Sequence, residues 1–396
     1  MRLAQRVRAI SPSPTLAMDA RAKELAKQGV DVVNFSVGEP DFDTPIHIRE
    51  AAIAAIREGF TRYTPAGGIP ELKQAVCARL ARDQGLEYGP EEIVVSVGAK
   101  HSLYNAVMAV CDPGDEVLIP APYWVTYPEQ VKLAEAVPVI VPVGEDQGFR
   151  VTAAALAERV TPRTRALILN SPNNPSGAVY GREELEALGE LVLAHDLWLI
   201  SDEVYEKLVY DGRRHVSPAT LDPALRARTV LVNAVSKTHA MTGWRIGYAA
   251  CPRELARAMT ELQGHVTSNP TSIAQRAALA ALTGPDEPVE AMREEFQRRR
   301  DYMASRLASI PGFACGVPEG AFYVFANISR FLGRTRAGRE LKDSADVAEF
   351  LLEKARVVTV PGAGFGSDLH LRFSYATARD RIEAGLNRVE EALARS

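Results

Sequence analysis

Short apolar runs and longer amphipathic stretches alternate along most of this chain. Apolar positions at a spacing of four residues, Ile48, Ala52 and Ile56, predict a helix over Ile46–Glu58. Helices also fill most gaps between the apolar runs, for example at Arg182–His195. Seven apolar runs predict buried strands: Glu92–Val97, Glu116–Pro120, Val137–Val143, Arg165–Asn170, Leu197–Ser201, Thr229–Val232 and Gly247–Cys251. This alternation implies an α/β domain with a mostly parallel sheet that is covered on both faces.

The two ends of the chain have a different texture. Ser11–Thr15 is rich in serine and proline, and a helix is expected over Leu16–Gln28. A long charged helix is expected over Val289–Ser309. Strand-rich patches and helical segments follow it at Gly320–Asn327, Ala345–Lys354, Arg356–Val360, Leu369–Ser374 and Asp380–Leu393. We therefore expect an N-terminal arm (1–45) that is part of a small domain, a large domain (46–285) and a small α+β C-terminal domain (286–396).

Length, charge and composition limit the kinds of protein that this chain can be. A chain of 396 residues is too long for one compact core, so two domains are the natural expectation. The net charge of −4 does not favour nucleic acid as a partner, and no apolar run reaches the roughly 18 residues that span a membrane. Four cysteines lie far apart without a C-x-x-C pair, which favours a reducing, cytoplasmic location. Seven scattered histidines show no metal-ligand spacing, so we expect no metal.

Candidate chemistry lies where the predicted strands end, because ligands of open α/β sheets bind at the carboxyl ends of the strands. The segment Gly98-Ala99-Lys100 opens a helix after the first strand, and free backbone N–H groups there favour a phosphate. The same segment also suits an ordinary turn. The loop over Asn170–Gly177 carries amide side chains that can hold a polar ligand group, although such loops are often only turns.

Two further strand ends carry charge. Asp202 closes an apolar strand and has Tyr205 within one helical turn, although a lone aspartate here is more often a helix N-cap. Lys237 follows the next strand, beside Ser236 and eight residues before Arg245. Burial lowers a lysine pKa and yields a nucleophilic amine, whereas most lysines are solvated surface groups. One ligand uses all four strand ends: pyridoxal phosphate needs a lysine, a carboxylate, polar contacts and a phosphate cradle.

Seven motifs, spread over nearly the whole chain, add to this picture. They are G-E-P-D-F-D-T-P at 38–45, Y-T-P-A-G-G-I-P-E-L at 63–72, P-Y-W-V-T-Y-P-E at 122–129, S-P-N-N-P-S-G at 171–177, S-D-E-V-Y at 201–205, S-K-T-H-A-M-T-G-W-R-I-G-Y at 236–248 and R-F-S-Y-A at 372–376. Together they resemble the class I (fold-type I) pyridoxal-phosphate aminotransferases, in the branch of bacterial aspartate or aspartate/prephenate aminotransferases. The resemblance implies the fold-type I architecture, with a mostly parallel seven-stranded sheet and a smaller α+β domain.

The resemblance also implies a role for each matching residue at the cofactor. Lys237 would form the Schiff base with pyridoxal 5′-phosphate and then move the substrate proton, and Asp202 would hold the ring N–H. The other cofactor contacts would come from Tyr205 and Asn174 at the phenolate oxygen, Trp124 stacked on the ring, and Ser236, Arg245 and the backbone of Gly98, Ala99 and Lys100 at the phosphate. Tyr63 would reach the phosphate of a neighbouring subunit, which implies a homodimer with shared active sites. Both Trp124 and Tyr63 could instead be core aromatics.

For the substrate, the resemblance places Arg372 on the α-carboxylate, assisted by the Gly38 backbone and Asn174. A distal carboxylate would be bound by Lys100 and by two hydroxyls of the N-terminal arm, Ser13 and Thr15, although Lys100 could simply be solvated. We therefore expect aspartate or glutamate as the amino donor and 2-oxoglutarate as the acceptor, in two half-reactions.

Four points stay open in the sequence. Some members of the branch act on prephenate, for which a basic residue just before the P-S of the arm is favourable, and Ser11 stands there. A β-eliminating lyase on the same fold is the alternative enzyme, and a cofactor-binding regulator would need a DNA-binding module longer than residues 1–45. Ala234 replaces a serine of many relatives, so one phosphate hydrogen bond is expected to be missing. The positions of His101 and His239 relative to the pocket do not follow from the sequence.

Overall fold

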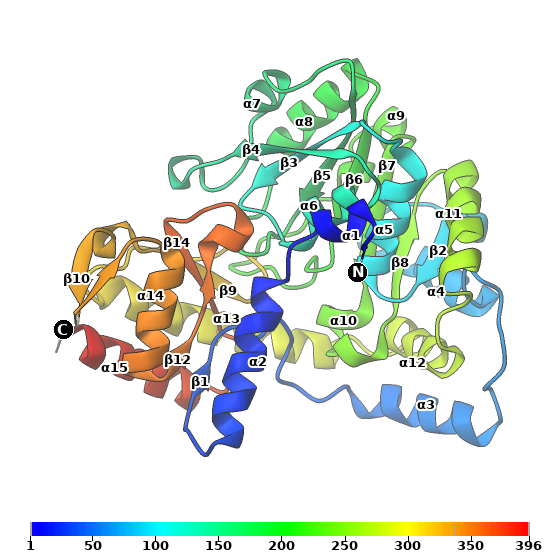
Figure 1. The fold of residues 1–396 in the computed structure, drawn as a ribbon. Helices are drawn as coiled ribbons and strands as arrows, with labels where there is room; N and C mark the ends of the chain where they lie inside the picture. Colours follow the sequence, from blue (N-terminus) through cyan, green and yellow to red (C-terminus); the bar gives the residue numbers. More distant parts are fainter. Residues whose placement is uncertain (1, 337, 395–396) are drawn as a thin grey trace.

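The computed structural model describes residues 2–336 and 338–394 and is built around a seven-stranded sheet (Figure 1). The strands are β2 (Ile93–Ser96), β3 (Glu116–Ala121), β4 (Val137–Pro142), β5 (Thr164–Asn170), β6 (Trp198–Asp202), β7 (Thr229–Ala234) and β8 (Gly247–Ala250). Their order in the sheet is β2-β8-β7-β6-β5-β3-β4. The strand β8 runs antiparallel to both of its neighbours, whereas the other pairs are parallel. The predicted mostly parallel α/β sheet is confirmed.

Helices cover both faces of this sheet. They are α3 (Ile46–Arg57), α4 (Pro70–Gln84), α5 (Ala99–Val110), α6 (Thr126–Leu133), α7 (Ala153–Ala157), α8 (Arg182–Ala194), α9 (Pro223–Arg226), α10 (Val235–Thr238), α11 (Arg253–Val266) and α12 (Ser272–Thr283). Successive residues of a strand point to opposite faces. In β3, Val117 and Ile119 pack in one core with residues of α5, whereas Leu118 packs in another core with residues of α8. This double burial explains why the strands appear in the sequence as nearly continuous apolar runs.

The remaining elements form smaller sheets and helices beside the large sheet (Figure 1). They are α1 (Gln5–Ala9), α2 (Pro14–Lys27), β1 (Val33–Asn34), α13 (Glu287–Ser309), β9 (Tyr323–Asn327), β10 (Arg334–Arg336), β11 (Arg339–Leu341), α14 (Ser344–Phe350), β12 (Val357–Val358), β13 (Val360–Pro361), β14 (His370–Ser374) and α15 (Arg379–Ala394). The antiparallel sheet β13-β14-β9 lies in this part, and β1 pairs with β12. The N-terminal segment therefore joins C-terminal elements. The domain boundaries at residues 45 and 285 stay a prediction.

The helix expected to begin at Leu16 begins at Pro14 instead. Proline suits the first helical position, because its fixed φ is already helical and its missing N–H would have no partner there. The Ser13 hydroxyl accepts a hydrogen bond from the Leu16 N–H at 3.5 Å and so caps the helix. No helix within residues 2–336 and 338–394 combines the length and the apolar character needed to cross a membrane.

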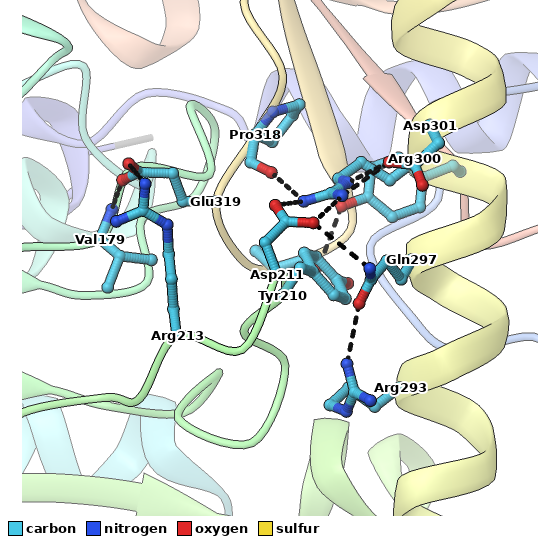
Figure 2. A network of polar contacts seen from close by, with 12 residues as sticks. Val179, Tyr210, Asp211, Arg213, Arg293, Gln297, Arg300, Asp301, Pro318 and Glu319 are labelled. Atoms are coloured by element: carbon cyan, nitrogen blue, oxygen red, sulfur yellow. Dashed lines mark hydrogen bonds and ion pairs between the residues drawn. The ribbon is translucent and has the colours of Figure 1, made fainter.

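A network of charged side chains ties α13 to the loop that follows β6 (Figure 2). Arg300 of α13 is only 2% exposed and donates hydrogen bonds to Asp211 at 2.7 and 2.8 Å and to the Pro318 carbonyl at 3.0 Å. Glu319 accepts a hydrogen bond from the Val179 N–H at 3.1 Å. A buried cation is tolerated when it is paired, so this network holds α13 and the turn before β9 against the loops of the large sheet.

Candidate active site

A cavity of about 330 Å³ lies at the carboxyl ends of the central strands. Its lining combines residues of the N-terminal arm, the large sheet and the C-terminal part, for example Thr15, Asp202 and Arg372. All the residues to which the sequence analysis gave a role at the cofactor or the substrate line this cavity, except Gly98, which lies directly behind Arg245, and Tyr63. Side chains that are far apart in the chain thus meet in one place.

Lys237 reaches the cavity from α10, a four-residue helix that follows β7. Its side chain is partly buried, and Nζ donates a hydrogen bond to the Gly38 carbonyl at 2.5 Å. Burial lowers the pKa of Lys237 to about 8, with the charge of Glu39 acting against this shift and the cations Arg245 and Arg372 adding to it. The amine is therefore more readily neutral, and more nucleophilic, than that of a solvated lysine.

Asp202 is the last residue of β6 and is 3% exposed. Its carboxylate accepts a hydrogen bond from the Tyr127 hydroxyl at 2.7 Å and another from the Val204 N–H at 3.3 Å. Burial raises the pKa of Asp202 to about 6, while these two hydrogen bonds act in the opposite direction. A turn follows Asp202 rather than a helix, so the interpretation as a helix N-cap is wrong. A buried carboxylate facing a cavity can hold a cationic N–H.

Behind Asp202 lies a second buried carboxylate that the sequence reasoning missed. Glu203 is fully buried and its oxygens lie 2.7 Å from His215 Nε2, 2.7 Å from the Ser217 hydroxyl and 2.9 Å from the Ser201 hydroxyl. Burial lowers the pKa of His215, but the charge and hydrogen bond of Glu203 outweigh it, and the net shift is upward. The pair keeps the charge of Glu203 compensated next to Asp202. The only sequence signal was its place beside Asp202 in the motif at 201–205.

The start of α5 and Arg245 form a cradle of N–H donors. Gly98 has a φ of +80°, and a Cβ at this position would collide with the Arg245 guanidinium. A Cβ at Gly247 would collide with the backbone of Ala99. The two glycines therefore allow the helix start and the guanidinium to lie close together. Ser236, which is 6% exposed, adds a hydroxyl from α10. Backbone N–H groups, a hydroxyl and a guanidinium are the donor set that suits a phosphate.

Arg372 lies at the other end of the cavity, on β14, and is 2% exposed. It donates hydrogen bonds to Asn174 Oδ1 at 3.0 Å and to the Ser36 carbonyl at 2.8 Å. Its guanidinium carbon lies 4.4 Å from the ring centre of Tyr323 and 5.0 Å from that of Phe365. Burial lowers the pKa of Arg372.

No carboxylate pairs with this buried cation among the described residues, and its Nε has no hydrogen-bond partner there. A buried guanidinium without an anion is costly unless a ligand supplies one. The arrangement therefore fits a carboxylate ligand.

A family model described as aminotransferase class I and II matches residues 30–389. The chain belongs to the class I and II aminotransferases. It is 53% identical over 392 residues to an aspartate aminotransferase of Geobacillus stearothermophilus, with 98% of each chain covered. It is 46% identical to the aspartate/prephenate aminotransferase of Nitrosomonas europaea, covering 99% of this chain and 100% of that one. The crystal structure of the aspartate aminotransferase from Rhizobium meliloti matches with a TM-score of 0.96 at 46% identity, over 100% of this chain and 99% of that one.

The resemblance seen in the motifs is therefore confirmed, and the chain is an enzyme that transfers amino groups. At the cavity mouth of this aminotransferase, Lys100 Nζ lies 4.9 Å from the ring centre of Trp124. The hydroxyls of Ser13 and Thr15 lie 2.9 Å apart beside it. Burial lowers the pKa of Lys100, and the Arg245 cation adds to this shift. The residues expected to read a distal carboxylate thus line one side of the mouth.

Tyr63, His101 and His239 of this aminotransferase do not line the cavity. Tyr63 is 90% exposed, so its interpretation as a core aromatic is wrong. His101 lines a neighbouring groove, where its ring lies nearly parallel to that of Tyr104. His239 is 3% exposed, and burial lowers its pKa to about 3. Neither histidine lines the cavity that holds Lys237.

Several residues of the cavity wall had no individual role in the sequence reasoning, among them Ser36, Tyr127 and Tyr323. Tyr127 stands inside the motif at 122–129, three residues after Trp124, so the motif itself was a usable signal. Ser36 acts through its backbone carbonyl, and Tyr323 lies in an aromatic run that is typical of a core strand. Neither carried a recognisable signal.

Proposed function

We propose that this aminotransferase works with pyridoxal 5′-phosphate bound in the cavity of Lys237. The observation that carries the proposal is the joint presence of a lysine amine with a lowered pKa, a buried carboxylate and a phosphate-type donor set around one cavity. The residues fit the cofactor at each of its functional groups. When bound, the cofactor withdraws electrons from the Cα of the amino acid attached to it.

In this proposal each residue has a defined task. The Lys237 amine would hold the cofactor and, as a free amine, would accept and give back the proton of the substrate Cα. Asp202 keeps the ring nitrogen protonated, and Tyr127 holds Asp202 in place through its 2.7 Å hydrogen bond. The remaining cofactor contacts are Tyr205 and Asn174 at the phenolate oxygen, Trp124 on the ring face, and Ser236, Arg245 and the backbone of Gly98, Ala99 and Lys100 at the phosphate.

We propose aspartate or glutamate as the amino donor and 2-oxoglutarate as the acceptor, in a ping-pong reaction. Two carboxylate-binding ends support a dicarboxylic substrate: Arg372, with Asn174 and the Gly38 backbone, and the mouth formed by Lys100, Ser13 and Thr15. The names of the similar proteins point the same way. Prephenate stays an alternative acceptor, because one of those names includes it. We also propose a cytoplasmic location.

The substrate proposal is tested by adding single amino acids to the cofactor-loaded protein and recording its visible absorbance. Aspartate or glutamate is expected to bleach the band, whereas an aromatic amino acid is not. Product assays separate the alternatives. The aminotransferase needs a 2-oxo acid to make a new amino acid, whereas a lyase releases pyruvate and ammonia without one. Bleaching by aromatic amino acids alone would contradict the proposed preference for acidic amino acids. Amino transfer to prephenate would add this oxo acid to the range of acceptors.

Replacing Arg372 with lysine is expected to raise the KM for both the amino acid and the oxo acid by roughly 10- to 100-fold, because a lysine keeps the charge but loses the fork of hydrogen bonds to a carboxylate. Steady-state kinetics measure this. Arg299→Lys is the matched control, since Arg299 is also buried but pairs with Asp41 and Glu295 outside the cavity. Equal KM values in the two variants would mean that Arg372 does not bind the substrate.

Replacing Lys100 with glutamine is expected to lower the preference for aspartate over an apolar amino acid by about tenfold, the effect of one charge-assisted hydrogen bond. The ratio of the two kcat/KM values measures this preference. Lys132→Gln serves as the control, because Lys132 is a lysine of the neighbouring groove and pairs with Glu129. An unchanged ratio in Lys100→Gln would mean that the lysine is merely solvated.

We propose a homodimer in which Tyr63 of one subunit completes the cavity of the other. Tyr63 is 90% exposed, and Ile46, Ile56 and Val266 also expose large apolar side chains, by 60%, 55% and 51%. In this arrangement, a mixture of Lys237→Ala and Tyr63→Leu chains forms hybrid dimers in which one site has neither substitution. After joint unfolding and refolding, we expect the mixture to be more active than the mean of the two parents. If the activity of the mixture equals the mean of the two parents, the active sites are not shared between subunits.

A further inference from the structure

Tyr323 contacts both Arg372 and Tyr205 in the cavity wall. It is the first residue of β9 and is fully buried, with its side chain in the cavity wall. The Arg372 guanidinium lies over its ring at 4.4 Å, and the ring meets that of Tyr205 edge-on, with the centres 6.0 Å apart. These contacts hold the Tyr323 ring in one orientation, so the position of its hydroxyl is fixed as well.

The hydroxyl of Tyr323 lies 2.9 Å from the hydroxyl of Tyr205, which is itself 3% exposed. Each phenol carries one proton, and the two oxygens can share only one hydrogen bond. If Tyr205 donates to Tyr323, its only hydroxyl proton lies between the two tyrosines and cannot be donated to a ligand in the cavity. If Tyr323 donates to Tyr205, the Tyr205 proton is free to be donated to an acceptor in the cavity. The direction of this one hydrogen bond therefore decides whether Tyr205 can donate into the site.

The charges around the pair favour Tyr323 as the donor. Burial raises the pKa of Tyr323, but the Arg372 cation over its ring acts against this. Burial also raises the pKa of Tyr205, and the Arg372 cation acts against this shift as well. Among the described residues, however, the guanidinium lies over the ring of Tyr323 and not over that of Tyr205. A cation on the face of a phenol ring draws electrons from it, so Tyr323 is the stronger acid and the better hydrogen-bond donor.

We propose that Tyr323 is a positioning residue that donates its hydrogen bond to Tyr205 and thereby directs the Tyr205 proton into the cavity. The inference rests on the proposed function, in which the acceptor is the phenolate oxygen of pyridoxal phosphate. A hydrogen bond received by Tyr205 also strengthens the one that Tyr205 donates, because bonds in a chain polarise one another. Arg372 would therefore have two effects. It would bind the substrate carboxylate, and its charge makes the Tyr323 hydroxyl a better hydrogen-bond donor.

The test is Tyr323→Phe, which removes the hydroxyl and keeps the ring over Arg372. We expect the dissociation constant of pyridoxal phosphate to rise about two- to tenfold, the effect of one weakened hydrogen bond. The pH at which the visible absorbance of the loaded protein changes is expected to move upward, because a phenolate that receives a weaker hydrogen bond binds its proton more tightly. Tyr375→Phe is the control: Tyr375 is also fully buried in the same core, but its hydroxyl donates to the Ala321 carbonyl at 3.1 Å.

A second comparison separates positioning from a general loss of packing. In a Tyr205→Phe background the added Tyr323→Phe substitution is expected to change neither readout, because the residue through which Tyr323 acts is absent. The proposal is overturned if Tyr323→Phe behaves like Tyr375→Phe, or if its effect persists in full in the Tyr205→Phe background. If the unsubstituted protein neither binds pyridoxal phosphate nor transfers amino groups, the proposed function itself fails, which is a different result.

Discussion

Replacing Lys237 with alanine is expected to lower the rate of amino transfer by about 10⁴-fold or more, because it removes both the amine that holds the cofactor and the base that moves the Cα proton. The structure gives this lysine two features that a surface lysine lacks. Its Nζ contacts the Gly38 carbonyl across the cavity, and burial lowers its pKa to about 8. The lowered pKa favours a neutral amine that attacks and accepts protons, and the contact with Gly38 holds this amine at the cavity.

The measurement is the rate of aspartate-dependent amino transfer by purified protein loaded with pyridoxal phosphate. Lys73→Ala is the matched control, because burial lowers the pKa of Lys73 as well, although that residue lies on α4 outside the cavity. We expect the control to retain nearly full activity. Turnover of Lys237→Ala at the rate of the unsubstituted protein would refute the mechanism.

Replacing Asp202 with asparagine is expected to lower amino transfer by roughly 10²- to 10³-fold, the effect of losing a charge placed where the reaction needs it. Asparagine has nearly the same shape, but it cannot keep a ring nitrogen protonated. The carboxylate is 3% exposed, so bulk solvent cannot take over its role. Retention of pyridoxal phosphate during dialysis should weaken in parallel with the rate.

Tyr127→Phe provides a graded comparison for this prediction. It removes the 2.7 Å hydrogen bond to Asp202 and leaves the charge in place, so an effect of about tenfold is expected. The two variants are compared by kcat and by the amount of cofactor retained. Equal losses in both variants would mean that the orientation of the carboxylate matters and its charge does not.

Much of the fold follows from burial alone. The central strands lie between two layers of helices, and residues such as Val117 and Leu118 face different cores. They therefore appear in the sequence as continuous apolar runs that are easy to recognise. Short elements were harder to predict, because a four-residue helix such as α10 shows no periodicity. The start of α2 at Pro14 depended on a single cap rather than on a pattern.

The candidate site divides in the same way. Asp202 and Lys237 could be found because a charge at the end of an apolar strand is conspicuous in the sequence. Arg372 came only from its motif, since nothing in the chain near it predicts a buried guanidinium without an anion. Tyr127 and Tyr323 reach the cavity through tertiary packing from α6 and β9. Their aromatic rings are indistinguishable, in the sequence, from those of an ordinary core.

The central claim is that Lys237 is the amine that carries pyridoxal phosphate. Borohydride reduction of the loaded protein makes that link permanent, and peptide mass spectrometry then locates it. We expect a single pyridoxyl group on the peptide that contains Lys237, and its loss when aspartate is added before reduction. A pyridoxyl group on another lysine, or none on Lys237, would contradict the account.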